Sequence, residues 1–154
     1  MSVAQQHVMR MKVAVLAGAL LVSGACGVQA GGPPAIVVDR TACSRCRMLI
    51  SEPLYAAAFQ APGDVAEVFD DIECLRDAAR TKAPGLRFWF HDADDRTWID
   101  GAEAVFVTAP EIRAPMGGRV IAFRDAGAAE RAALKHHGRI VGAISNLLTR
   151  EGGS

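Results

Sequence analysis

The sequence predicts an α+β fold with antiparallel sheets behind a short N-terminal export segment. After about residue 30, short apolar stretches and two amphipathic segments follow one another in the order strands, helix, strand, and this order occurs twice. Hydrophobic residues make up 51% of the 154 residues, which is enough to form a core. The 17 basic and 17 acidic residues balance, so the basic excess typical of nucleic-acid-binding proteins is absent from the sequence.

The N-terminus has the pattern of a secretory signal. Arg10 and Lys12 precede an apolar run at residues 13–22, and small residues follow at 23–25. The run is shorter than the ~20 residues that a membrane-spanning helix needs. We therefore expect the mature protein outside the cytoplasm, in the periplasm.

Cys26 directly follows the small residues and gives a lipobox-like end to the signal. This interpretation makes residues 1–25 a lipoprotein signal peptide, Cys26 the acylated residue, and residues 26–34 a tether that anchors the protein to a membrane. Ser23 departs from the pattern, because Leu or Val is usual there. Ordinary cleavage after Ala30 and an uncleaved anchor are the alternatives.

The first half of the mature chain contains one predicted helix among strands. Asp71 is a natural N-cap for an amphipathic helix that ends before Pro84 and Gly85. The residues around it are β-branched or bulky. We expect strands at residues 35–39, 55–60, 66–69 and 86–91, with a cysteine-bearing loop at 40–48 and the helix at 71–82.

The second half repeats this order. Asp125 is placed to cap a helix, and Gly138 to stop it. We expect strands at residues 97–99, 104–108, 120–123 and 140–142, a Pro- and Gly-rich loop at 110–118, a helix at 125–137 and a terminal helix at 143–150.

Cys43, Cys46 and Met48 place three sulfur atoms within six positions. Thiolate and thioether are soft ligands that suit Cu(I), whereas zinc prefers four ligands and makes little use of thioether. Two other interpretations of the cysteine pair remain open. One is a disulfide, which an oxidising compartment favours. The other is the active pair of a periplasmic thiol–disulfide oxidoreductase, although residues 48–53 make a poor helix start.

Two further sulfur residues are ambiguous. Met116 lies in a Pro-Met-Gly-Gly loop, where it can point at a site or fill a gap beneath the loop. Cys74 lies on the first predicted helix and is either packing or an additional ligand. Asp70 and Asp71 are interpreted as helix caps, and no neighbouring residues complete a catalytic set with them.

Four stretches together resemble the NosL family of lipoprotein copper chaperones. They are CSRCRM at 43–48, FDDIECL at 69–75, WIDGA at 98–102, and PMGG at 115–118 followed by IAF at 121–123. The resemblance implies a fold of two small ββαβ-like units, which we divide at residues 35–92 and 93–154. It also implies a non-enzymatic protein that binds Cu(I) and delivers it to nitrous oxide reductase, together with a membrane transport complex. The ligands expected from the family are Cys46 and Met116 first, then Met48 and Cys43.

Arg47 departs from the family pattern, which usually has Gly between the second Cys and the Met. Gly adopts a positive φ more readily than Arg does, so the loop conformation is in question, while the donor atoms are retained. A lyase-like enzyme is a further alternative that rests on fold analogy alone.

Overall fold

The computed structural model describes residues 31–149, and the structural statements below concern this part of the chain. The predicted signal peptide at 1–25, the acylated Cys26 and the last expected helical position, Arg150, lie outside it. The elements in chain order are η1 (Pro53–Tyr55), β1 (Ala57–Gln60), β2 (Glu67–Phe69), α2 (Ile72–Ala79), β3 (Arg87–His91), β4 (Trp98–Asp100), β5 (Val105–Thr108), β6 (Val120–Phe123), α3 (Ala126–Lys135), β7 (Arg139–Gly142) and α4 (Ile144–Thr149).

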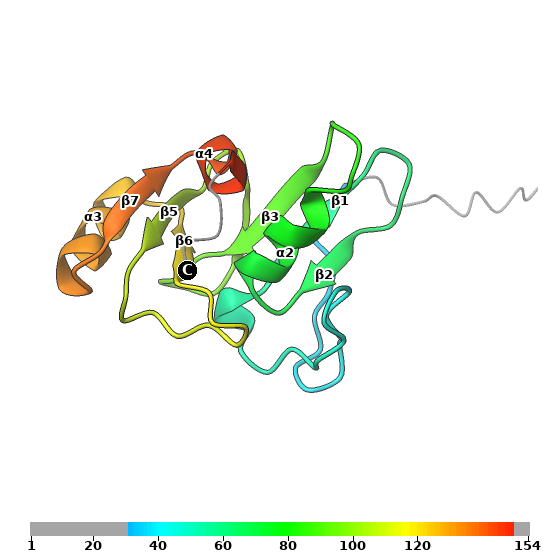
Figure 1. Ribbon diagram of the computed structural model, residues 1–154, viewed down its shortest axis with the longest axis horizontal. Helices are drawn as coiled ribbons and strands as arrows, with labels where there is room; N and C mark the ends of the chain where they lie inside the picture. Colours follow the sequence, from blue (N-terminus) through cyan, green and yellow to red (C-terminus); the bar gives the residue numbers. More distant parts are fainter. Residues whose placement is uncertain (1–30, 150–154) are drawn as a thin grey trace, which may run out of the picture. The chain divides into compact units, whose positions relative to one another are not determined.

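Two antiparallel sheets, each with one helix inserted between strands, confirm the α+β class and the two ββαβ-like units (Figure 1). The first sheet has the order β2-β1-β3-β4, and α2 connects β2 to β3. The second has the order β6-β5-β7, and α3 connects β6 to β7. The strand pairs within both sheets are antiparallel.

β4 belongs to the first sheet, although the sequence division counted its residues with the second unit. Trp98 pairs with His91, and Asp100 pairs with Trp89, so β4 extends the edge beyond β3. The two sheets meet where Asp92 forms a parallel bridge to Ala122 of β6.

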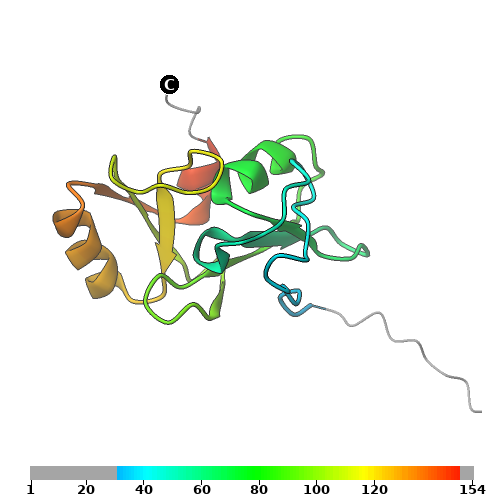
Figure 2. The ribbon, with the colours of Figure 1, turned by 90° about the horizontal axis from the view of Figure 1, so that it is seen from below.

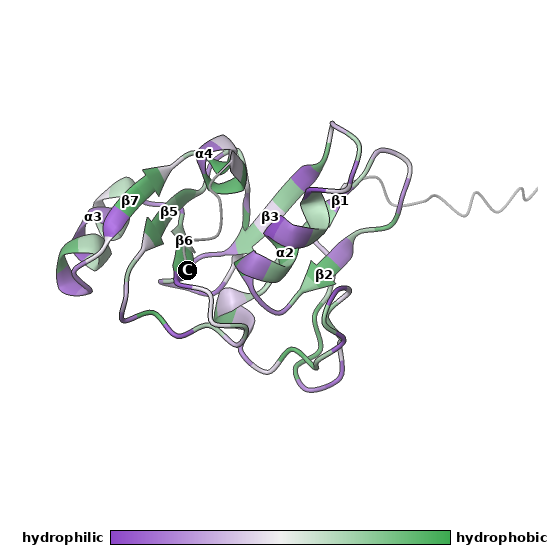
Figure 3. Cartoon of the chain, in the orientation of Figure 1, coloured by the Kyte–Doolittle hydropathy of each residue, from purple (hydrophilic) through white to green (hydrophobic). Residues whose placement is uncertain are grey.

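The larger of two hydrophobic clusters among the described residues contains residues from both units, and the smaller lies between the second sheet and α3. The larger cluster contains Phe59, Phe69 and Phe90 from the first sheet and Phe106 from the second. The rings of Phe90 and Phe106 lie edge to face with centroids 4.7 Å apart, which is a favourable aromatic geometry. Figure 3 shows the strands β5, β6 and β7 as predominantly hydrophobic. β5 and β6 are mostly buried, whereas the residues of the edge strand β7 are half-buried or exposed. The short helix α4 lies beside α2 (Figures 1 and 2).

Both main helices begin at the predicted caps. Asp71 Oδ1 accepts a hydrogen bond from Cys74 N at 2.9 Å, and Asp125 Oδ1 accepts one from Ala128 N at 2.7 Å. Beyond α3 the chain turns at Gly138, where a Cβ atom would stand 2.5 Å from Thr108 O, so only glycine fits there. None of the described helices is long and apolar enough to cross a membrane.

The strand expected at residues 35–39 is wrong. Val37 O instead accepts hydrogen bonds from Arg40 N and Thr41 N, and Asp39 adopts a φ of 58°, which closes a turn. The chain then folds back, with an isolated bridge between Ala42 and Leu49. We call residues 37–50 the thiol hairpin, because it carries Cys43 and Cys46. The expected loop at 40–48 forms part of it.

Candidate metal centre

Four side chains converge beside the start of α2: Cys43, Cys46, Asp70 and Cys74. One ligand atom from each lies within 4.8 Å of the corresponding atoms of the other three. They come from the thiol hairpin, the end of β2 and the first turn of α2. The described cysteines are all free thiols, so no disulfide competes for their sulfur atoms.

Backbone hydrogen bonds fix the thiol hairpin. Cys43 N donates to Met48 O at 2.8 Å, which closes the loop that contains both cysteines. Ser44 exchanges hydrogen bonds with Val68 of β2 through its amide and its hydroxyl. These contacts hold the hairpin against the strand that ends at Asp70, and they explain why residues far apart in sequence share one site.

Arg47 adopts a φ of 68°, the left-handed conformation that favours glycine. Its amide donates to Cys43 O at 3.1 Å, which completes the turn. The loop therefore keeps the backbone shape that glycine would provide, with an exposed arginine side chain in place of a hydrogen atom.

Asp70 is the residue that sequence reasoning missed. Both aspartates of the pair were interpreted as caps, but only Asp71 caps α2. Asp70 is 1% exposed, and its Oδ1 accepts a hydrogen bond from Cys46 Sγ at 3.5 Å. Its buried Oδ2 has no hydrogen-bond partner among the described residues. A buried acceptor without a partner is costly, so this oxygen is placed to receive a ligand or a metal ion. The only sequence signal was that a helix has one N-cap, which leaves the second aspartate without that role.

The sequence alone leaves Cys74 ambiguous between packing and ligation. The structure brings its sulfur into the cluster with Cys43 and Cys46, while its amide is held by the Asp71 cap. It is 4% exposed, so it forms the inner wall of the site.

The protein environment favours the protonated form of the Cys46 and Cys74 thiols. Burial raises the pKa of the Cys46 thiol, and burial together with the neighbouring Cys43 raises the pKa of Cys74. A bound metal ion deprotonates a coordinating thiol, so metal binding at this site releases protons.

The two methionines lie at the outside of the site region. Met48 is 51% exposed on the thiol hairpin, and Met116 is 44% exposed. The loop at 109–119, which we call the Met116 loop, reaches the first unit because Met116 N donates to Asp71 Oδ2 at 3.0 Å. Gly118 allows this approach, since a Cβ atom there would already stand 3.0 Å from the same oxygen. Ligation by Cys46, Met116, Met48 and Cys43 remains a prediction.

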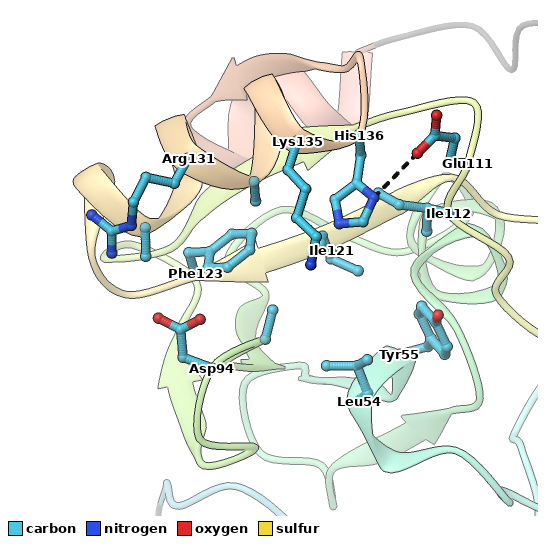
Figure 4. Close-up of a pocket in the computed structure, with 13 residues that line it drawn as sticks. Leu54, Tyr55, Asp94, Glu111, Ile112, Ile121, Phe123, Arg131, Lys135 and His136 are labelled. Atoms are coloured by element: carbon cyan, nitrogen blue, oxygen red, sulfur yellow. Dashed lines mark ion pairs between the residues drawn. The ribbon is translucent and has the colours of Figure 1, made fainter.

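A cavity of about 440 Å³ lies away from the thiols, between α3, β6 and η1 (Figure 4). Tyr55, Phe123 and Lys135 line it, and at its edge His136 Nδ1 lies 3.4 Å from Glu111 Oε2. None of the cluster residues contributes to it. We place the candidate metal centre at the thiol cluster because soft-metal binding depends on the donor atoms and not on the size of a hollow.

Comparison with known proteins gives one family and one fold. The family model NosL matches residues 34–145. The crystal structure of the copper chaperone NosL from Shewanella denitrificans matches with a TM-score of 0.58 and 19% sequence identity, over 70% of this chain and 92% of that one. No curated protein sequence matches this chain.

Proposed function

This chain belongs to the NosL family, and on that premise we propose that it binds Cu(I) as cargo and delivers it by ligand exchange for the assembly of nitrous oxide reductase. The observation that carries the proposal is the convergence of three free thiols on one point beside a buried carboxylate. Thiolates are the ligands that Cu(I) prefers, and a cluster of them is the expected core of a soft-metal site.

The exposure of the sulfur atoms suits a transfer site. Cys43 and Cys74 are buried, Cys46 is half-buried, and Met48 and Met116 are largely exposed. In this proposal the thiolates hold the metal from inside, while weaker thioethers cover its outer side. A partner's ligand then displaces a thioether first, so that the metal is never without ligands during the exchange.

The alternative of a thiol–disulfide oxidoreductase is less consistent with the site. Such an enzyme needs a thiolate of lowered pKa, usually at a helix N-terminus. Here Cys46 lies in a hairpin turn, and burial raises the pKa of its thiol. Cys43 is fully buried, so it offers no surface for attack on a substrate disulfide.

Export and lipidation at Cys26 complete the proposal. They would hold the domain at a membrane in the periplasm, beside a transport complex that takes part in the maturation of the reductase.

Anaerobic titration with Cu(I) against a competing chelator tests the binding step. We expect one ion per chain, an affinity loss of at least about 100-fold in Cys46→Ser, and a loss of about 10-fold in Met116→Leu. Arg45→Lys is the matched control, since it changes an exposed side chain of the same turn, keeps the charge that faces Asp77, and removes no sulfur atom. Undiminished affinity in Cys46→Ser would reject the site, and copper-independent reduction of insulin that requires both Cys43 and Cys46 would favour the oxidoreductase.

A further inference from the structure

The thiol hairpin carries much of the exposed hydrophobic surface of the described chain. Of the eight large hydrophobic residues that this part of the chain exposes, four lie on the hairpin: Val37, Val38, Met48 and Leu49, each at least 44% exposed. The other four are distributed over separate segments. A concentration of exposed apolar side chains on one short segment is typical of a surface that another molecule covers.

The same hairpin is positively charged within a chain of zero formal net charge. It contains Arg40, Arg45 and Arg47, against Asp39 as its one acidic residue. Arg45 is paired with Asp77 at 2.9 Å. Arg40 and Arg47 are exposed and form no ion pair with any residue that the structure describes. Two guanidinium groups are therefore available to a partner.

From these features we infer that the thiol hairpin is the docking surface for the protein that exchanges copper with this chain, and that this partner presents an apolar patch rimmed by carboxylates. The inference rests on the proposed function and names the surface and the partner chemistry for it. Apolar side chains of the hairpin then pack against the centre of the patch, and Arg40 and Arg47 pair with its rim.

The position of the cargo favours a protein over a membrane as the occupant. Met48 is itself part of the exposed apolar surface, so a molecule that covers the hairpin also covers the outer side of the metal site. A transfer partner must bring its own ligand to that side. A lipid surface there would block the exchange instead of performing it.

The test compares two variants of the full-length chain, each expressed in the native host in place of the wild-type protein. The hairpin variant combines Val38→Ser with Arg40→Glu, which leaves every sulfur atom in place. The matched control combines Leu134→Ser with Arg131→Glu, which makes the same two changes at exposed positions of α3. Three quantities are measured: the Cu(I) affinity of each purified protein, the rate at which nitrous oxide reductase gains copper in the cells, and binding to phosphatidylglycerol vesicles.

We expect both variants to keep the wild-type Cu(I) affinity within about twofold, and the hairpin variant alone to slow the copper loading of the reductase by about tenfold or more. Arg40→Lys, which preserves the charge, should load at the wild-type rate. Equal loading by the hairpin and control variants would overturn the inference. So would slowed loading by the hairpin variant with a parallel loss of vesicle binding, because the hairpin would then be a membrane contact. Unchanged reductase copper in a strain lacking this chain would overturn the delivery function itself, and the docking surface with it.

Discussion

The helices of the two ββαβ units begin with the same kind of N-cap, but the residues beside the two caps differ in their ability to bind a metal ion. In each unit an edge strand ends in Phe, and after one intervening residue comes an Asp that caps the helix: Asp71 in the first unit and Asp125 in the second. Each cap accepts a hydrogen bond from the residue three positions on, which is Cys74 in α2 and Ala128 in α3. The helix position that supplies a thiol in one unit therefore supplies a methyl group in the other.

The residue before each cap differs in the same sense. Asp70 is buried and faces Cys46. Arg124, at the equivalent place, reaches outward and donates to Thr97 Oγ1 and to Trp98 O. The ββαβ unit is thus a common scaffold. The candidate metal centre of the first unit depends on two segments that this scaffold does not include. These segments are the thiol hairpin before β1 and the long Met116 loop between β5 and β6, where the first unit has only the short connection at 61–66.

The largest expected effect comes from exchanging the equivalent helix residues. Cys74→Ala should lower the Cu(I) affinity by at least about 100-fold, because it removes an inner thiolate from the cluster. Ala128→Cys should leave the affinity unchanged, since the three cysteines in residues 31–149 lie in the cluster beside α2 and not beside α3. Competition with a Cu(I) chelator measures both. If Cys74→Ala keeps the wild-type affinity, Cys74 is not a ligand and only packs in the core.

A smaller effect should separate the two caps. Asp125→Ala should reduce the free energy of unfolding by about 1 kcal/mol, the usual cost of a lost N-cap. Asp71→Ala should cost about 2 kcal/mol, because it also removes the hydrogen bond to Met116 N. Burial raises the pKa of Asp71, and the cost of burying this carboxyl group offsets part of that bond's contribution. Urea unfolding measures the difference, and hydrogen exchange at the Met116 amide should accelerate only in Asp71→Ala. Equal losses in the two variants would show that the tether to the Met116 loop contributes nothing.

The smallest effect is in the pH dependence of stability, where the two units should respond in different ranges. Burial lowers the pKa of His91 in the first unit, so its contribution to stability is lost as the pH falls from the ordinary value of 6.5 towards the lowered folded value. Hydrogen bonds from His137 and then His136 lower the pKa of Glu111 in the second unit. Its contribution is present above the ordinary value of 4.5 and is lost as the pH falls through the folded value.

Melting temperatures of His91→Phe and Glu111→Gln across this pH range test that separation. His91→Phe should remove the decline that begins near pH 6.5, and Glu111→Gln should reduce the decline below pH 4.5. An unchanged decline below pH 4.5 in Glu111→Gln would contradict the assignment.

The sequence predicted the secondary structure better than it predicted the site. Asp71 and Asp125 defined the helix starts because capping is a local interaction between a side chain and the next turn. Residues 35–39 had β-branched side chains but no strand to pair with, and the turn at Asp39 redirected them into the hairpin. Propensity alone could not show that.

The site depends on contacts between distant residues, which no local pattern reveals. The role of Asp70 is decided by a hairpin 24 residues earlier in the chain. Cys74 joins the cluster because that hairpin is held against β2 by Ser44 and Val68. The sulfur residues of the CxxCxM segment predict a soft metal. Only the folded structure shows that Asp70 and Cys74 lie beside the two cysteines of this segment.

Asp71 has a further consequence, because its two carboxylate oxygens hold two different amides. Oδ1 accepts from Cys74 N in the first unit, and Oδ2 accepts from Met116 N in the second. A carboxyl group is planar and rigid, so the spacing between these two backbone positions is set by covalent bond lengths and two hydrogen bonds. Two sulfur-bearing residues from the two ββαβ units are therefore held at a nearly fixed backbone spacing by a single side chain.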